Sequence, residues 1–255
     1  MRDIGNKYSV VICIPCYNEE KRLNMGAFEE FTAAHERIKF LFINDGSGDN
    51  TLKLLGETTA NSGNLFLLNL EKNGGKAEAV RRGMLHAKEV FKADYVGFWD
   101  ADLATPLEEI LPFIKMIQEG NFDAVTGLRL TRLGARVKRK ASRHILGRIF
   151  ATVASKVLKV PVYDTQCGAK LFKEEIIPYL FTETFSTRWL FDVEILARNI
   201  QKNGAEHVRT KVYEYPVFTW QDVGGSQVKL KDFVRAPLEL LKIKRRYLRK
   251  ANKIK

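Results

Sequence analysis

A short apolar run meets two carboxylates in the segment Tyr95-Val96-Gly97-Phe98-Trp99-Asp100-Ala101-Asp102-Leu103-Ala104-Thr105-Pro106. A helix is expected to start at once, because Thr105 suits an N-cap, Pro106 suits the first helical position and Glu108 completes a capping box. Asp100 and Asp102 should therefore lie at the carboxyl end of a buried strand, where open α/β sheets bind ligands. Two neighbouring carboxylates repel each other, and a divalent ion that carries a substrate diphosphate would relieve that repulsion. The alternative is an acidic turn that only caps the helix.

Apolar runs and helical stretches alternate along the first half of the chain. We expect strands at residues 9–15, 38–43, 65–70, 95–99 and 123–127, and helices at 19–36, 50–60, 76–91 and 106–118. Apolar runs without polar alternation are typical of strands covered on both faces. Regular strand–helix alternation predicts an α/β fold with a mostly parallel central sheet flanked by helices.

The composition indicates an anionic partner. The formal net charge is +12, which fits nucleic acid, a membrane surface or phosphorylated substrates. No nucleic-acid-binding motif accompanies the charge, which disfavours the first of these. Three cysteines do not make a disulfide framework, and Cys13 and Cys16 have no second pair with which to hold zinc. No signal peptide and no run of roughly 20 apolar residues is found, so we expect a cytoplasmic protein that is soluble or peripheral to a membrane.

The second half is basic. A cluster without nearby acids comprises Arg136, Lys138, Arg139, Lys140 and Arg143. Residues 145–160 are expected to form an amphipathic helix whose apolar face carries Ile145, Ile149, Val153 and Val157. This helix either packs on its own domain or lies at a membrane interface, which its basic polar face favours. Residues 242–255 hold eight basic residues and no acidic one. They form either a solvated tail or a membrane contact worth about 1 kcal/mol per charge.

Four predicted strand ends carry polar motifs in a fixed order: residues 15–19, 44–47, 73–76 and 100–102. Together they resemble the nucleotide-sugar-binding half of inverting family-two glycosyltransferases, which have the GT-A fold. Residues 164–172 and 188–194 are similar to the dolichyl-phosphate glucosyltransferase branch, which belongs with other polyprenyl-phosphate glycosyltransferases. Asn44 and Gln227 depart from the residues common there. Eukaryotic members of that branch carry an N-terminal membrane helix not found in this sequence, which suggests a prokaryotic relative with a different prenyl acceptor.

The resemblance implies a catalytic domain over residues 1–235, with a nucleotide-sugar half (8–130) and an acceptor half (131–235), followed by a basic helix or tail (236–255). It implies transfer of glucose from UDP-glucose to a polyprenyl phosphate, with Mg²⁺ or Mn²⁺, at the cytoplasmic face of a membrane. The residues implied to bind the donor are Pro15, Tyr17, Glu19, Asp45, Lys76, Asp100 and Ala101. Asp102 is implied as the metal ligand, and Arg129 with Arg139 or Arg143 as the site of the acceptor phosphate. Asp100, Asp102 and Asp192 are the implied catalytic residues.

Several alternatives stay open from the residues alone. Asp45 could form an Asx turn, Lys76 could be an exposed surface lysine, and Asp192 could cap a helix or accept a buried hydrogen bond. The donor could be GDP-mannose. A hydroxyl acceptor would require a general base, for which Asp192 is the candidate. A lipid phosphate needs none, because a phosphate monoester is mostly dianionic at neutral pH. Charge alone would also fit a non-catalytic nucleotide- or nucleic-acid-binding protein.

Overall fold

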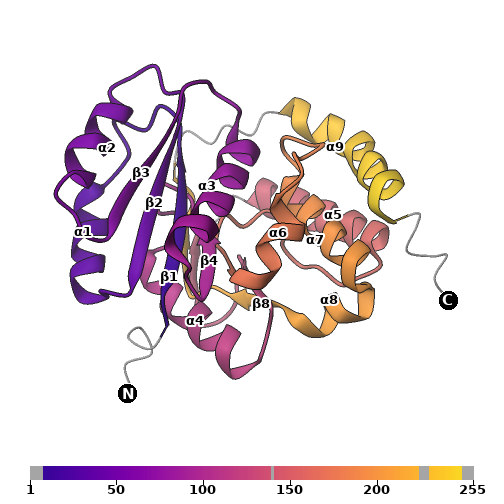
Figure 1. Cartoon of the computed structure of the whole chain (residues 1–255). Helices are drawn as coiled ribbons and strands as arrows, with labels where there is room; N and C mark the ends of the chain where they lie inside the picture. The colour runs from indigo at the N-terminus through magenta and orange to yellow at the C-terminus, as the bar shows by residue number, and fades with distance from the viewer. Residues whose placement is uncertain (1–7, 139–140, 224–229, 249–255) are drawn as a thin grey trace.

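A seven-stranded sheet forms the centre of the protein (Figure 1). The computed structural model describes residues 8–138, 141–223 and 230–248. The sheet has the order β3-β2-β1-β4-β7-β5-β8, and β7 is antiparallel to both of its neighbours whereas the other pairs are parallel. Its strands are β1 (Val10–Cys16), β2 (Ile38–Asp45), β3 (Leu65–Leu70), β4 (Tyr95–Phe98), β5 (Ala124–Leu128), β7 (Lys170–Lys173) and β8 (Val212–Pro216). The predicted α/β class with a mostly parallel sheet is confirmed.

Helices cover both faces of this sheet, and further helices pack on that layer from outside. They are α1 (Met25–Ala34), α2 (Thr51–Thr59), α3 (Lys76–Phe91), α4 (Ile110–Glu119), α5 (Ala141–Leu158), α6 (Ile177–Phe181), α7 (Phe191–Asn203), α8 (Ala205–Lys211) and α9 (Leu230–Ile243). A π-helical turn, Lys244–Leu248, continues α9. Two short strands, β6 (Arg136–Lys138) and β9 (Thr219–Gln221), pair separately. Among the described helices, none is long and apolar enough to cross a bilayer.

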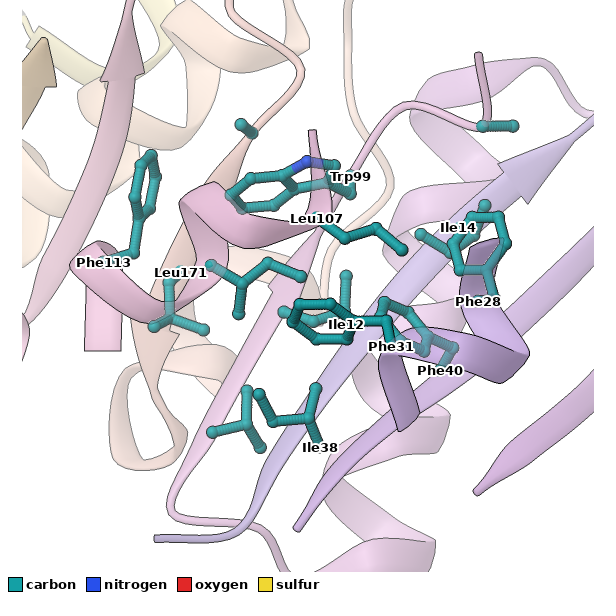
Figure 2. Packing of buried hydrophobic residues seen from close by; sticks show 14 of the residues in the cluster. Ile12, Ile14, Phe28, Phe31, Ile38, Phe40, Trp99, Leu107, Phe113 and Leu171 are labelled. Carbon is teal, nitrogen blue, oxygen red and sulfur yellow. The ribbon is translucent and has the colours of Figure 1, made fainter. Parts of the chain in front are cut away.

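The core divides according to the alternation of side chains along the strands. Ile12 and Ile14 of β1 point to the layer that holds Phe28, Trp99 and Phe113 (Figure 2). The intervening residues of β1 face α3, α6 and α7 on the other side of the sheet. A third cluster lies between α5, α7 and α9. Burial of β1 on both faces explains its continuous apolar sequence.

Two predicted helix starts are wrong. The helix expected at residues 19–36 begins only at Met25, because the preceding residues form a turn and the Asn24 side chain accepts the Ala27 N–H as an N-cap. The helix expected from Pro106 starts as a 3₁₀ turn at Leu107–Glu109, without a side-chain cap, so the capping box is not formed. Thr105 is instead buried, and its carbonyl accepts the Trp99 indole N–H at 2.9 Å.

Helix α5 uses a different face from the one that its sequence pattern singled out. Phe150, Ala154 and Leu158 pack in the third core cluster. The predicted apolar positions Ile145 and Ile149 are 57% and 58% exposed. The helix therefore packs on its own domain and still presents an apolar stripe to the outside.

The second half of the chain is built into the same sheet as the first. Strands β7 and β8 follow residue 131, and β7 lies between β4 and β5 of the first half. The boundary expected at residue 235 falls inside α9, whose buried side chains belong to the third core cluster.

Candidate active site

A cavity of about 570 Å³ opens at the carboxyl ends of β1, β2 and β4. Its volume lies within the usual range for small-molecule sites. Ten residues that the sequence singled out line it: Pro15, Tyr17, Glu19, Asp45, Lys76, Asp100, Ala101, Asp102, Arg129 and Asp192. Arg139 lies outside the described residues, and Arg143 belongs to α5 without a described side chain.

Asp100 follows β4 and forms an ion pair with Lys76 at the start of α3. Loss of solvation would raise the pKa of Asp100, but the Lys76 ammonium outweighs it and lowers the pKa. The loop before β7 approaches this carboxylate so closely that a Cβ at residue 168 would collide with it, so any larger residue there would displace the Asp100 side chain. Asp100 is therefore held between α3 and the Gly168 backbone.

Asp102 lines the same cavity, and one of its carboxylate oxygens already accepts a hydrogen bond within the protein. Its Oδ1 accepts the Ala104 N–H at 3.1 Å. Burial, followed by the charge of Asp100, raises the pKa of Asp102. The described residues contain no group of three or more His, Cys, Asp or Glu side chains that could hold a metal unaided. One or two carboxylates are nevertheless what Mg²⁺ or Mn²⁺ needs when substrate phosphates complete its shell, so Asp102 and Asp100 suit such an ion.

The Asp45 carboxylate organises the loop that leads into α3. It accepts the backbone N–H groups of Gly74 and Gly75, each at 2.8 Å. Gly75 has φ +84° and precedes the first residue of α3, so the positive end of a 16-residue helix faces the cavity. The guanidinium of Arg188 lies beside Gly75, and its Nη2 is 3.4 Å from the Gly74 carbonyl. Two cations and a helix N-terminus thus meet at one wall.

Asp192 lies in the first turn of α7 and lines the same cavity as Lys76. Its carboxylate is 2.8 Å from the Nζ of Lys170, a buried lysine of β7. Lys170 also donates to the carbonyls of Thr165 and Cys167, at 3.1 and 2.6 Å. Burial outweighs the two neighbouring lysines and raises the pKa of Asp192. Lys170 thereby joins Asp192 to the loop that holds Asp100.

Arg129 extends from the end of β5 into a fixed position. Its Nε and Nη2 donate to the two oxygens of Asp164 at 2.7 and 2.8 Å. Its guanidinium also lies 5.4 Å from the Trp220 ring centroid. The backbone N–H of Asp164 is bound in turn by the Glu214 carboxylate at 2.7 Å. Burial acts to lower the pKa of Arg129, but Asp164 overrides it and raises the pKa, so the guanidinium keeps its charge.

Comparison with known proteins settles the family. The sequence profile described as Glycosyl transferase family 2 matches residues 11–181. The chain is a family-two glycosyltransferase. A dolichyl-phosphate beta-glucosyltransferase of Trichomonas vaginalis is 33% identical, over 92% of this chain and 72% of its own length. The dolichyl-phosphate beta-glucosyltransferase of Saccharomyces cerevisiae is 31% identical, over 93% of this chain and 74% of its own.

Solved structures share the fold of this family-two glycosyltransferase at low sequence identity. Glucosyl-3-phosphoglycerate synthase from Mycobacterium tuberculosis, in complex with Mn²⁺, UDP and glucosyl-3-phosphoglycerate, superposes with a TM-score of 0.68. It is 16% identical and covers 94% of this chain and 81% of its own. The predicted GT-A fold is thus confirmed.

Two charged residues of this glycosyltransferase site, Lys170 and Glu214, have no role predicted from the sequence. Arg188 is predicted from the sequence either to shape the sugar or lipid entrance or simply to pack, and the structure places it in the cavity lining beside Gly75. The sequence offers one signal for Lys170, which directly precedes the apolar residues Leu171 and Phe172. A lysine in such a strand would be buried, and lysine is almost never fully buried without a partner. Glu214 alternates with tyrosines in β8 and carries no comparable signal.

Proposed function

We propose that this glycosyltransferase moves glucose from UDP-glucose to the phosphate of a polyprenyl, dolichyl-type lipid, with inversion at the sugar. The observation that carries the proposal is a single cavity with two kinds of anion-binding wall. The α3 N-terminus, Lys76 and Arg188 suit a nucleoside diphosphate. Arg129, which follows β5 and is held by both oxygens of Asp164, suits a second phosphate. The names of the relatives from T. vaginalis and S. cerevisiae support the same donor sugar and acceptor class.

The donor would lie along the ends of β1, β2 and β4. Pro15 and Tyr17 would contact the nucleoside, while Asp45 would act on the base or by shaping the Gly74–Gly75 loop. The solved complexes of the structural neighbour contain UDP-glucose with Mn²⁺, and UDP with Mg²⁺. Asp102, next to Asp100, would hold such an ion, which supplies Lewis-acid stabilisation of the leaving diphosphate.

A phosphate acceptor makes few demands on the protein. It is already dianionic and nucleophilic at neutral pH, so its needs are orientation and charge balance. Arg129 would provide the orientation, because Asp164 and Trp220 fix its guanidinium while the N–H groups of Nη1 take no part in the ion pair with Asp164. Its charge would be shared between Asp164 and the phosphate. Arg139 and Arg143 remain further candidates for this phosphate from the sequence.

A hydroxyl acceptor is the second candidate. The observation that favours it is the raised pKa of Asp192, because a carboxylate with a raised pKa is a better general base. The Lys170 ion pair opposes this role, since it ties the Asp192 carboxylate to the protein interior.

The proposed lipid acceptor places the reaction at a membrane surface. The exposed stripe of α5, Ile145, Leu146, Ile149 and Val153, offers apolar contact there. Phe150 and Gly147 of the same helix line the cavity, so α5 reaches from the stripe to the site. We propose that the protein binds the cytoplasmic face peripherally through this helix and its basic residues.

The test is a donor and acceptor screen. Radiolabelled UDP-glucose or GDP-mannose is incubated with polyprenyl phosphate vesicles, with Mg²⁺, Mn²⁺ or chelator, and the lipid-extractable label is followed. Label should enter lipid from UDP-glucose only when a divalent ion is present. Absence of transfer from both donors would refute the proposal. Transfer to an added alcohol but not to lipid phosphate would favour the second candidate, a hydroxyl acceptor.

Metal binding is tested separately from turnover. Titration of Mn²⁺ in the presence of UDP, followed by calorimetry, should give binding to the native protein and none to Asp102→Asn. Glu108→Gln, which removes an exposed carboxylate outside the cavity lining, is the matched control and should bind as the native protein does.

A further inference from the structure

Glu194 is a fully buried carboxylate that does not belong to the lining of the active-site cavity. Its side chain is 0% exposed. Ser186 and Thr187 each donate a backbone N–H and a hydroxyl to it, at 2.9 to 3.1 Å. Arg198 donates from the next turn of α7 at 3.0 Å, and the Tyr247 hydroxyl donates at 2.7 Å. A carboxylate that accepts this many hydrogen bonds holds the donor residues in fixed positions relative to α7.

The segment fixed by Glu194 leads directly to the active site. Arg198 extends the hold by donating to the carbonyls of Leu180, Glu183 and Thr184, at 2.7 to 2.9 Å. Residues 180–187 are therefore anchored to one side of α7 along their length. The next two residues, Arg188 and Trp189, line the cavity. Since the anchored turn ends one residue earlier, its position decides where the Arg188 guanidinium meets the α3 N-terminus.

The C-terminal segment completes this anchor from outside the sheet. Tyr247 is 3% exposed and belongs to the π-helical turn after α9. Lys242 donates to the Ser186 carbonyl at 2.7 Å, and Arg246 pairs with Glu183 at 3.1 Å. Three side chains of one segment thus bind the same connection. The sequence suggested only a solvated tail or a membrane contact for this region.

The protonation states of Tyr247 and Glu194 favour the hydrogen bond between them. Burial acts to raise the pKa of Glu194, but the donors from Ser186 and Tyr247 and the charge of Arg198 lower it. Burial, then the bond to Glu194 and its charge, raises the pKa of Tyr247 to about 12. The tyrosine therefore remains a donor and the glutamate an acceptor.

We propose that Glu194 and Tyr247 are positioning residues of the donor site, which hold the Arg188–Trp189 wall in the place where Arg188 binds the diphosphate of the nucleotide. The inference rests on the proposed function only in that the cavity binds a nucleoside diphosphate. It gives the first turns of the basic C-terminal segment a role in substrate binding that does not depend on lipid.

The decisive variant is Tyr247→Phe, which keeps the buried ring and removes only the hydroxyl. The dissociation constant of UDP should rise roughly three- to tenfold, which is less than the loss of a direct hydrogen bond to a charged group would give, because the Tyr247 hydroxyl acts on UDP only through the position of Arg188. The KM for UDP-glucose should rise in parallel, while kcat at saturating donor and the KM for polyprenyl phosphate hold within about twofold. Hydrogen exchange in residues 183–190 should accelerate at temperatures well below the melting point.

Tyr179→Phe is the matched control. It removes a tyrosine hydroxyl that is hydrogen-bonded at 3.0 Å to Asn203, at the other end of α7. It should leave UDP binding and exchange in residues 183–190 unchanged. A second pair of variants separates the loss of a positive charge from the loss of the anchoring contact. Lys242→Met removes the hydrogen bond to the Ser186 carbonyl and should weaken UDP binding. Lys244→Met removes the charge of an exposed lysine two residues further on and should not.

Two results would overturn the proposal. One is native UDP affinity and native exchange in a folded Tyr247→Phe protein. The other is an equal loss of affinity in Tyr179→Phe, which would reduce the effect to general destabilisation of α7. Failure of the proposed function is distinguishable from both, because UDP binding by the native protein is measured without sugar transfer or lipid.

Discussion

Replacement of Gly168 by alanine tests whether the loop before β7 holds Asp100 in place. The backbone of Gly168 is not in the left-handed region, so alanine adds no conformational strain there. A Cβ at this position would nevertheless lie closer than 3.0 Å to all three atoms of the Asp100 carboxylate. The carboxylate would have to move by about 1 Å, and displacement of that size at a reacting centre costs on the order of 100-fold in rate. Overpacking should also lower the free energy of unfolding by about 1–3 kcal/mol.

The assay combines sugar transfer with thermal unfolding. Gly168→Ala should remain folded, with a lower melting temperature, and transfer at about one hundredth of the native rate. Gly48→Ala is the matched control, because a Cβ there meets nothing within 4 Å. Native transfer by Gly168→Ala would show that the placement of Asp100 does not govern the reaction. An equal loss of transfer in Gly48→Ala would show that the effect does not come from the contact between residue 168 and Asp100.

Three further predictions concern the acceptor, the membrane and the pH. Arg129→Lys keeps the charge but loses the bidentate fork. We expect a KM for polyprenyl phosphate at least about tenfold higher, with UDP affinity unchanged. A change in both the KM for polyprenyl phosphate and the affinity for UDP would assign Arg129 to the donor. Ile149→Glu should lower partition onto anionic vesicles about tenfold, as measured by sedimentation, because burial of an isoleucine side chain contributes roughly 1.5–3 kcal/mol to the free energy of binding. Val90→Glu on α3 is the control. Equal binding by both variants would exclude the α5 stripe. Because the pKa of Asp102 is raised, protons should compete with Mn²⁺ already above the ordinary aspartate value of about 3.9; UDP-dependent Mn²⁺ affinity that stays constant down to that pH would contradict the ligand assignment.

The buried parallel strands were predictable because their physical cause is local. Strands β1 and β2 are covered on both faces, and this condition leaves continuous apolar runs in the sequence. Strand β7 has only four residues and begins and ends with lysine, so no run marks it. Strand β8 alternates and stays partly exposed. Their places in the sheet depend on partners far away in the chain.

The face of α5 illustrates a different limit. Periodicity found an apolar stripe at Ile145, Ile149 and Val153, and the helix exists over that range. Packing, however, uses Phe150, Ala154 and Leu158. A helix with apolar residues on two sides has no local feature that says which side its own domain will cover.

Charged residues of the site were found unevenly for a similar reason. Motifs at strand ends revealed Asp45, Lys76 and Asp100, because the chemistry and the turn lie within a few residues. The support under Arg129 joins residues 129, 164 and 214, and the anchor at Glu194 joins residues 186 and 247. Such long-range pairs leave no spacing that a single sequence can display.

The position of β7 limits how specificity can change in proteins of this architecture. Strand β7 is the only described element that joins β4 to β5, although both of these come earlier in the chain. A chimera that joined two sequences near residue 130 would take β7, an internal strand of its central sheet, from the other parent. It would also import the glycine on which Asp100 rests. New acceptors are therefore expected to arise by changes within the loops around this strand rather than by exchange of whole halves.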